Sequence, residues 1–288
     1  MTLDELAAFL DPPMPAGRLK LEKHMNQAGR LPVRLLMAGV CAFTLAGGAL
    51  TGLAPAYAAV CAPYQHITVH GTDWIRSPDN FGGGNACLNQ PNGTVSFTVK
   101  SQTAPPPAGN GVAAYPHLAR GCEFPDPNAL GDCTKGWTAK PVTQMTGSTI
   151  TWTSSHTGVA KTARYNTGAD LWFSATPQFS APVTEVMFWQ NVQGLKPSPR
   201  AVKVRKDGHN WWYWTEPAAS GPFTWTEVIF MRTRNITSWD KMPIHPLLNY
   251  AVQHAAMNSG SYWVGAALGF ELWNGGGGLK TTSGWIHQ

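Results

Sequence analysis

The sequence is short of charged residues, which make up only 13% of its 288 positions. After residue 58 it carries 16 Lys and Arg against 12 Asp and Glu, a net charge of +4. Apart from Lys203–Lys206 these cations are scattered, and no basic stripe interleaves with aromatic residues, so we expect no nucleic-acid partner. Tryptophan is plentiful instead, with 13 in the chain. This balance is typical of a rigid extracellular β-protein rather than a charged helical one.

The sequence also lacks a long hydrophobic run. Its most apolar segment, Leu35–Ala46, ends at Gly47 and is short for a helix that spans a membrane. Two arginines precede this segment and a small-x-small site follows it, which together predict a secretory signal cleaved near Ala58. We therefore assign residues 1–58 to an N-terminal extension and signal, in which Met25 is an ordinary signal start. We expect a secreted, extracellular protein with no stable membrane span after cleavage.

Cysteine is scarce as well, and one of the five, Cys41, lies in the predicted signal. The other four, Cys61, Cys87, Cys122 and Cys133, are an even number in an exported chain, so we expect disulfides. Four cysteines allow three pairings, and we predict the local one, Cys61–Cys87 with Cys122–Cys133. No Cys-x-x-Cys spacing occurs and the nine histidines are dispersed, so we expect neither a metal site nor another cofactor.

The exported part, residues 59–288, shows short β-type runs between turn signals, which predict one all-β domain built as a sandwich or barrel. There are no internal repeats and no linker. The candidate strands are His66–Val69, Thr94–Val99, Thr149–Ser154, Ala169–Ser174, Glu185–Asn191, Ala201–Val204, Trp211–Trp214, Trp225–Met231 and Tyr262–Leu272. In Lys241–Val252 four apolar residues share one face and the prolines stand only near the start, so we expect a single packed helix there.

Two aromatic runs each contain one glutamate. Side chains alternate faces along a strand, so Glu185 shares a face with Met187 and Trp189, and Glu271 shares a face with Trp273. An isolated carboxylate is costly to bury, and tryptophan is a poor choice for a solvated face. A cleft that stacks sugar rings on tryptophan and cuts between two carboxylates needs both residue types. The pattern therefore predicts glycoside hydrolysis.

These two runs and a third resemble glycoside hydrolase family 12, a family of compact endo-β-1,4-glucanases. Gly168–Phe173 is similar to the family's strand with an aspartate before an aromatic residue, Glu185–Trp189 to its Glu-x-Met-x-Trp nucleophile strand, and Gly269–Trp273 to its acid/base strand. The segment around Cys122 and Cys133 resembles the loop disulfide of the bacterial members. The resemblance covers most of the exported chain. It implies a concanavalin-like β-jelly-roll sandwich of two antiparallel sheets with one packed helix.

The resemblance also implies roles for three carboxylates. Retaining glycosidases hold two carboxyl groups about 5–5.5 Å apart, so that one attacks the anomeric carbon while the other protonates the leaving oxygen. By motif, Glu185 is the expected nucleophile and Glu271 the expected general acid and base. Charge on Glu185 and apolar surroundings would both keep Glu271 protonated until it acts. Asp170 is expected to hydrogen-bond to Glu185 or to bias it electrostatically.

Five further residues are expected to contact the sugar chain. Trp189 and Trp273 share the glutamates' faces and are predicted as cleft walls. Met187 is typical of the family and suits packing beneath a sugar as well as plain filling. Trp74 resembles the family's early stacking tryptophan, although the residues on either side of it differ from the family's pattern. Pro197 is expected in the loop that crosses the family's cleft.

The function predicted on these grounds is that of a secreted, retaining endo-β-1,4-glucanase that acts on cellulose-type glucans as a monomer. Xyloglucan or mixed-linkage glucan is the alternative substrate, because branch tolerance depends on loops at the rim of the cleft. A non-catalytic carbohydrate-binding jelly roll is the alternative outside the enzyme class. A structural surface sandwich whose aromatic residues are all core would leave both glutamates unexplained.

Overall fold

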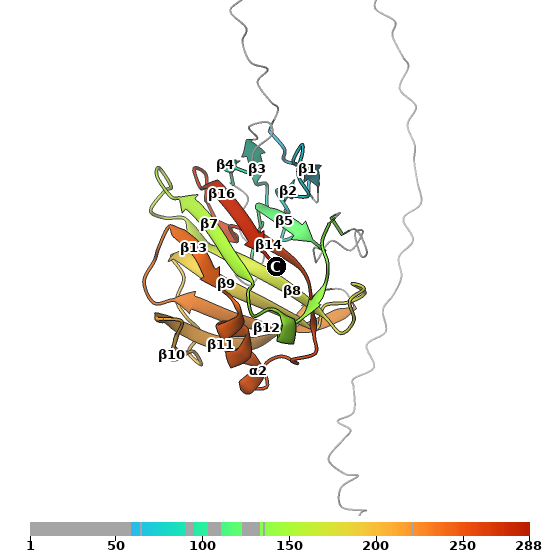
Figure 1. The fold of residues 1–288 in the computed structure, drawn as a ribbon. Helices are drawn as coiled ribbons and strands as arrows, with labels where there is room; N and C mark the ends of the chain where they lie inside the picture. The colour runs from blue at the N-terminus through green and yellow to red at the C-terminus, as the bar shows by residue number, and fades with distance from the viewer. Residues whose placement is uncertain are drawn as a thin grey trace, which may run out of the picture. The chain divides into compact units, whose positions relative to one another are not determined.

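The structure is a computed structural model that describes residues 59–63, 65–89, 95–102, 111–122, 133–134, 136–220 and 222–288 (Figure 1). The predicted signal and Cys41 lie outside the described residues. Across these ranges, no helix is both long enough and apolar enough to cross a bilayer.

Strands make up most of the regular structure, and the all-β class predicted from the sequence is confirmed. In chain order the strands are β1 (Ile67–Thr68), β2 (Ile75–Ser77), β3 (Cys87–Asn89), β4 (Phe97–Ser101), β5 (His117–Gly121), β6 (Lys140–Pro141), β7 (Thr149–Ser155), β8 (Arg164–Ser174), β9 (Thr184–Gln193), β10 (Val202–Lys206), β11 (His209–Ser220), β12 (Phe223–Arg232), β13 (Ser238–Pro243), β14 (Tyr262–Gly269), β15 (Leu272–Asn274) and β16 (Lys280–His287). The helical elements within the described ranges are the 3₁₀ turn η2 (Val142–Gln144) and the α-helix α2 (His245–Gln253).

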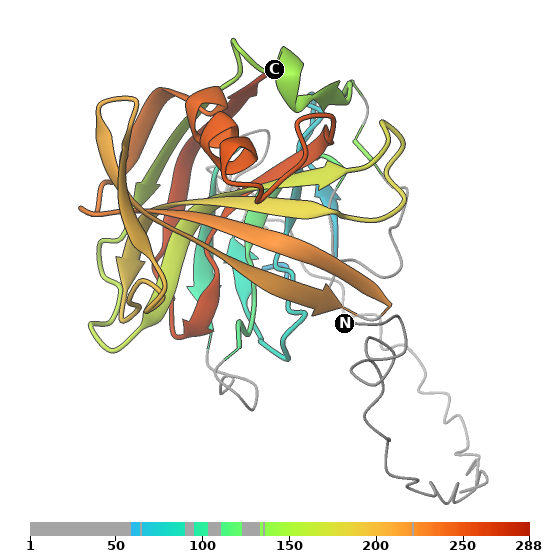
Figure 2. The ribbon, with the colours of Figure 1, turned by 90° about the horizontal axis from the view of Figure 1, so that it is seen from below.

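The strands form two sheets that pack as layers (Figures 1 and 2). The larger sheet has the order β1-β2-β5-β14-β8-β9-β12-β11-β10, with β15 beside β8 and β6 beside β14. The smaller sheet has the order β13-β7-β16-β4-β3. This arrangement confirms the predicted β-jelly-roll sandwich with one helix.

One neighbouring pair departs from the expected antiparallel order, because β9 and β12 run parallel. After β9 the chain forms the antiparallel hairpin of β10 and β11. It then continues as β12, which pairs with β11 on one side and with β9 on the other. A parallel pair needs a long connection between its strands, and this hairpin supplies it. The pairing places two distant stretches of sequence in register at the centre of the larger sheet.

The core lies between the two sheets. In β9, Val186 and Phe188 are fully buried in this core, whereas the alternate residues of the strand face away from it. The ring of Phe270 joins the two layers, since its centroid lies 5.7 Å from that of Phe97 in β4 and 6.0 Å from that of Trp152 in β7. One face of each central strand is therefore committed to the core, which leaves the other face free for a site.

The helix begins later than the sequence predicts. The expected helix spans Lys241–Val252, whereas α2 spans His245–Gln253 and the residues before it belong to β13. Pro246 lies in the first turn of α2, where its N–H would have no helical partner in any case. Met242 precedes Pro243, and a residue before a proline favours the extended conformation that Met242 has in β13. The apolar face that α2 turns into the core consists of Leu247, Leu248 and Ala251.

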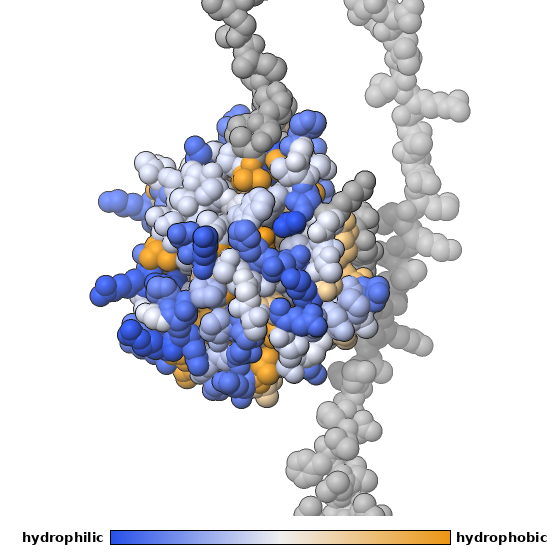
Figure 3. All heavy atoms as spheres, viewed as in Figure 1, coloured by the Kyte–Doolittle hydropathy of each residue, from blue (hydrophilic) through white to orange (hydrophobic). Residues whose placement is uncertain are grey.

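Exposed apolar residues are scattered rather than gathered. On the face drawn in Figure 3, hydrophobic residues appear as separate spots among hydrophilic ones. The large hydrophobic residues that are exposed in the described ranges are Phe81, Val183, Val202 and Trp285. Single exposed apolar residues of this kind are ordinary on a protein surface.

The predicted disulfide pairing is confirmed, with Cys61 joined to Cys87 and Cys122 joined to Cys133. The bridged residues are 26 and 11 positions apart. The first bridge ties the start of the described chain to β3. The second ties the end of β5 to the segment before β6.

Removing the bridge with the longer loop is expected to destabilise the fold more. A disulfide restricts the unfolded chain in proportion to the logarithm of its loop length, so Cys61→Ser/Cys87→Ser should lower the free energy of unfolding by about 3.5 kcal/mol and Cys122→Ser/Cys133→Ser by about 2.8 kcal/mol. Urea unfolding followed by tryptophan fluorescence measures both losses, with the oxidised wild type as control. A larger loss for the second pair would contradict this entropic account.

Candidate active site

A cavity of about 430 Å³ lies on the face of the larger sheet that points away from the core. Alternate residues of β8, β9 and β12 form its floor, and residues from the end of β11 and from the loops before β5 form its walls. The acidic residues that line it are Asp79, Asp170, Glu185, Glu227 and Glu271. No Lys or Arg is found among the described residues of this lining. The three carboxylates predicted from motifs are therefore brought together in one cavity.

Glu185 is held by β9, whose alternation turns it away from the core into the cavity, and only 5% of it is exposed. The indole Nε1–H of Trp225 donates a hydrogen bond of 2.9 Å to its Oε2. Burial raises the pKa of Glu185 well above its ordinary value, and the nearby charges of Glu227, Asp170 and Glu271 raise it further. The hydrogen bond from Trp225 opposes this rise, because it stabilises the ionised carboxylate.

Glu271 lies in the break between β14 and β15. Asn166 of β8 holds it there, because the backbone N–H of Asn166 donates to the backbone oxygen of Glu271 at 3.1 Å. Its amide Nδ2–H donates to Oε2 of Glu271, and its Oδ1 accepts from the backbone N–H of Glu271 at 3.4 Å. Burial raises the pKa of Glu271 well above its ordinary value, the charge of Asp170 adds to the rise, and the bond from Asn166 opposes it.

Asp170 is 3% exposed and stands in β8, where it pairs with Met187 of the neighbouring β9. Burial raises its pKa to about 7, although the hydroxyl of Tyr115 and the charge of His117 both pull the pKa down. Asp170 in turn raises the pKa of both Glu185 and Glu271. It therefore biases both glutamates through its charge.

Glu227 is a further carboxylate of the cavity that motif comparison misses. It stands in β12 as the direct partner of Glu185 in the parallel ladder. Burial raises its pKa to about 8, and the charges of Glu216 and Asp170 contribute to the rise. The sequence pattern of Trp225–Met231 could have identified Glu227. Side chains alternate along this strand, so Glu227 lies on the face opposite Val228, just as Glu185 lies opposite Val186.

The predicted sugar-contacting residues separate into two groups. Met187 lines the cavity. Trp189 and Trp273 share the face of the sheet with the carboxylates, but they pack against each other, with ring centroids 6.3 Å apart, in a cluster with Trp214. Neither tryptophan is among the residues that line the cavity, and the half-buried Pro197 is not either. The alternation of side chains along a strand predicts which face these residues lie on. It does not predict how far they lie from the carboxylates.

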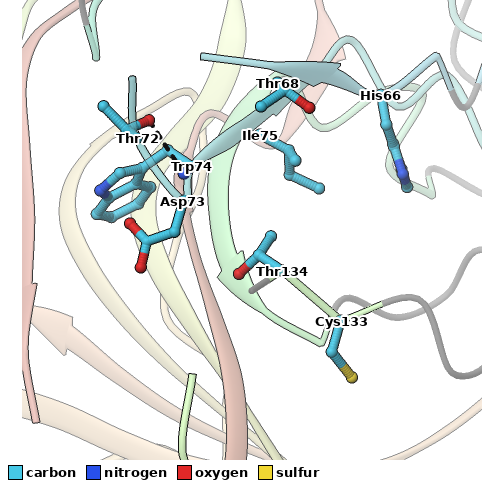
Figure 4. Close-up of a pocket in the computed structure, with 8 residues that line it drawn as sticks. All are labelled: His66, Thr68, Thr72, Asp73, Trp74, Ile75, Cys133 and Thr134. Carbon is cyan, nitrogen blue, oxygen red and sulfur yellow. Dashed lines mark hydrogen bonds between the residues drawn. The ribbon is translucent and has the colours of Figure 1, made fainter. Parts of the chain in front are cut away.

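Trp74 lies elsewhere, because it is only 1% exposed and packs into the core between the sheets. Its neighbour Ile75 takes the opposite side and packs with Tyr115 and Ala119. Figure 4 shows Trp74 and Ile75 among the residues that line a second pocket, of about 390 Å³, which shares no lining residue with the carboxylate cavity. A buried indole offers no face for a sugar ring, so we do not include Trp74 among the sugar-binding residues.

No group of three or more His, Cys, Asp or Glu residues that could hold a metal ion occurs in the described ranges. Glu185 and Glu271 instead accept hydrogen bonds from a tryptophan and an asparagine donor. Such a set of donors and acceptors is suited to placing negative charge and protons beside a neutral substrate.

Comparison with solved structures finds this two-sheet jelly roll among the glycoside hydrolases. More particularly, the fold of this chain is that of glycoside hydrolase family 12. The sequence matches no protein-family model and no curated protein. The similarity is seen in comparison with solved structures.

Among these structures is the endoglucanase cel12A from Rhodothermus marinus, with 25% identity and a TM-score of 0.68 over 80% of this chain and 98% of the other. A metagenome-derived endoglucanase of family 12 gives 25% identity and a TM-score of 0.68 over 80% and 96%. A family 12 xyloglucanase from Bacillus licheniformis gives 20% identity and a TM-score of 0.68 over 80% and 99%. The fold is thus shared with proteins named for two different β-glucan substrates.

Proposed function

We propose that this protein is a secreted, retaining endo-β-1,4-glucanase. The observation that supports this most is that Glu185 and Glu271 come from separate elements and are buried in the same cavity. They lie close enough for the charge of Glu271 to raise the pKa of Glu185. Endoglucanases of the same fold are the second support.

In the first step, the Glu185 carboxylate attacks the anomeric carbon, and Glu271 gives its proton to the glycosidic oxygen as the carbon–oxygen bond breaks. Glu271 is suited to this task because burial and nearby negative charge raise its pKa and keep the proton in place. Glu185 is suited to its own task by the Trp225 Nε1–H, which stabilises a carboxylate in an otherwise unfavourable site.

In the second step, Glu271 acts as a base. It takes a proton from water, the water oxygen attacks the anomeric carbon, and the bond to Glu185 breaks, which restores both carboxyl groups. The amide of Asn166 favours the ionised form of Glu271 during this half of the reaction. Burial, which raises the pKa of Glu271, thus serves its role as an acid, and the bond from Asn166, which lowers that pKa, serves its role as a base.

Xyloglucan is the second candidate substrate. An open hollow of about 640 Å³ adjoins the cavity and shares Pro217, Ala218, Ala219 and Trp225 with it. It lies on the β11–β12 hairpin side of Glu185 and has room for the side branch of a decorated glucan. The family 12 fold also occurs in xyloglucanases.

The remaining parts of the proposal concern location and assembly. We propose export through the N-terminal signal with cleavage near Ala58, and a monomer whose partner is the polysaccharide itself. The two disulfides suit an oxidising extracellular setting, and the scattered exposed apolar residues suit a monomeric surface.

Release of reducing ends tests the proposed activity. Wild type and Glu185→Gln are compared on carboxymethyl-cellulose, mixed-linkage β-glucan and xyloglucan. The wild type should hydrolyse at least one of the three, and Glu185→Gln, which keeps the shape of the side chain but cannot attack, should lose activity on all. The substrate with the highest kcat/KM decides among cellulose-type glucan, mixed-linkage glucan and xyloglucan. An inactive wild type would show that the proposed function is wrong, and an active Glu185→Gln would show that Glu185 is not the nucleophile.

A further inference from the structure

Three glutamates stand side by side across the larger sheet. Glu227 is the direct partner of Glu185 in the ladder between β12 and β9, and the direct partner of Glu216 in the ladder between β12 and β11. Neighbouring strands lie about 5 Å apart, and paired residues project to the same face. We call Glu185, Glu227 and Glu216 the glutamate row.

Burial increases along the row toward the proposed nucleophile. Glu216 is exposed, Glu227 is half-buried and Glu185 is 5% exposed. The other titratable groups that act on the row, Asp170 and Glu271, are acidic too. Like charges placed directly opposite each other destabilise a sheet, so the row lowers the stability of the fold. Because the glutamate row destabilises the sheet, its effect on Glu185 explains its presence more readily than packing does.

We propose that Glu227 is a positioning residue for the nucleophile: its carboxylate, fixed beside Glu185 by the parallel ladder, sets the pH at which Glu185 becomes ionised and reactive. The inference rests on the proposed function, because it assigns Glu227 a role in that same reaction. Glu227 itself forms no bond to the substrate.

The direction of the effect follows from the charges. A negative charge on Glu227 opposes a second one on Glu185, which raises the pKa of Glu185. Trp225 acts in the opposite direction, because its Nε1–H stabilises the ionised carboxylate and lowers that pKa. Both residues belong to β12, two positions apart on the same face. This strand therefore carries two opposing controls on a single carboxylate.

The pH profile of kcat/KM on a soluble, uncharged β-glucan tests the inference. Glu227→Gln keeps the shape of the side chain and removes the charge that Glu227 acquires as the pH rises through about 8. At and above that pH the acid limb should therefore move about one pH unit lower, which gives about a tenfold gain in kcat/KM on that part of the limb. Glu216→Gln is the matched control, since it removes an exposed charge one strand further from Glu185 and should move the limb less. Trp225→Phe should move the limb in the other direction, to higher pH.

Thermal stability gives a second readout that does not depend on catalysis. The carboxyl of Glu227 has a pKa of about 8 in the folded protein and an ordinary value of 4.5. The folded state therefore binds an extra proton between these pH values, and stability is lost as the pH rises through this window. The Tm of the wild type should fall between pH 5 and pH 8, and the Tm of Glu227→Gln should fall less.

The outcomes separate this inference from the proposed function. An active wild type with an unshifted acid limb in Glu227→Gln overturns the inference and leaves the function in place. Complete loss of activity in a folded Glu227→Gln also overturns it, because a residue that only adjusts the nucleophile is dispensable for turnover. A wild type inactive on every glucan overturns the function, and the role of Glu227 with it.

Discussion

Glu185→Ala is expected to lose turnover on the order of 10⁴-fold or more, and added azide or formate is expected to restore part of it. The substitution removes the atom that bonds to the anomeric carbon and leaves a gap on that face of the sugar. A small anion that enters the gap attacks from the same side as the missing carboxylate. With azide and an aryl β-glycoside as donor, the product should be the α-linked azide, identified by NMR.

The control for this experiment is Glu185→Gln, which removes the nucleophile and leaves no gap for an anion. It should be as inactive as Glu185→Ala and should not respond to azide. Near-UV circular dichroism establishes that both variants are folded. Rescue of Glu185→Gln, or a β-linked azide from Glu185→Ala, would contradict the nucleophile assignment.

Glu271→Ala is expected to fail in a different way. With an activated aryl leaving group no proton is needed, so Glu185 can still form the glycosyl-enzyme, but hydrolysis of that intermediate lacks its base and slows. A burst of aryl alcohol followed by a slow steady state should appear in stopped-flow measurements. Azide needs no base, so it should accelerate the second step and give the β-linked azide.

The natural glucan is the internal control for Glu271→Ala. Its leaving group is a sugar alcohol that does need a proton, so its hydrolysis should fall much further than that of the aryl substrate. An equal loss on both substrates would show that Glu271 is not the proton donor. Full activity in the variant would show that Glu271 has no catalytic role.

Alternation along strands predicts a large part of the fold, because one face of each central strand is committed to the core. Val186 and Phe188 are buried as their parity requires, and Glu185 faces away from them. The start of the helix was harder to predict, since Lys241–Pro243 continues a strand that pairs with β7. That pairing depends on a partner about 90 residues earlier, as the bond from the Lys241 N–H to Thr151 illustrates.

The residues of the candidate site that belong to sequence motifs can be predicted from the sequence. Residues that only the fold brings into the site cannot. Asp170, Glu185 and Glu271 stand in motifs, and the structure gathers them in one cavity. Asn166 contacts Glu271 across 105 positions of the sequence, and no local pattern marks Asn166 as part of the site. For Trp74 a local motif was misleading. Strand β2 begins only after Trp74, so the alternation of side chains along a strand does not predict which way this tryptophan points.

The parallel pairing of β9 and β12 also joins segments that are far apart in the sequence. Trp225 contacts Glu185 across 40 positions, and β10 and β11 lie between them in the chain. Closing this pair therefore brings carboxylates together in the same event that closes a long loop. When those carboxyls hold protons, their mutual repulsion disappears and the closing step becomes easier. Protonation of Glu185, which would stop it from acting as the proposed nucleophile, would thus also favour formation of the strand pair that holds it.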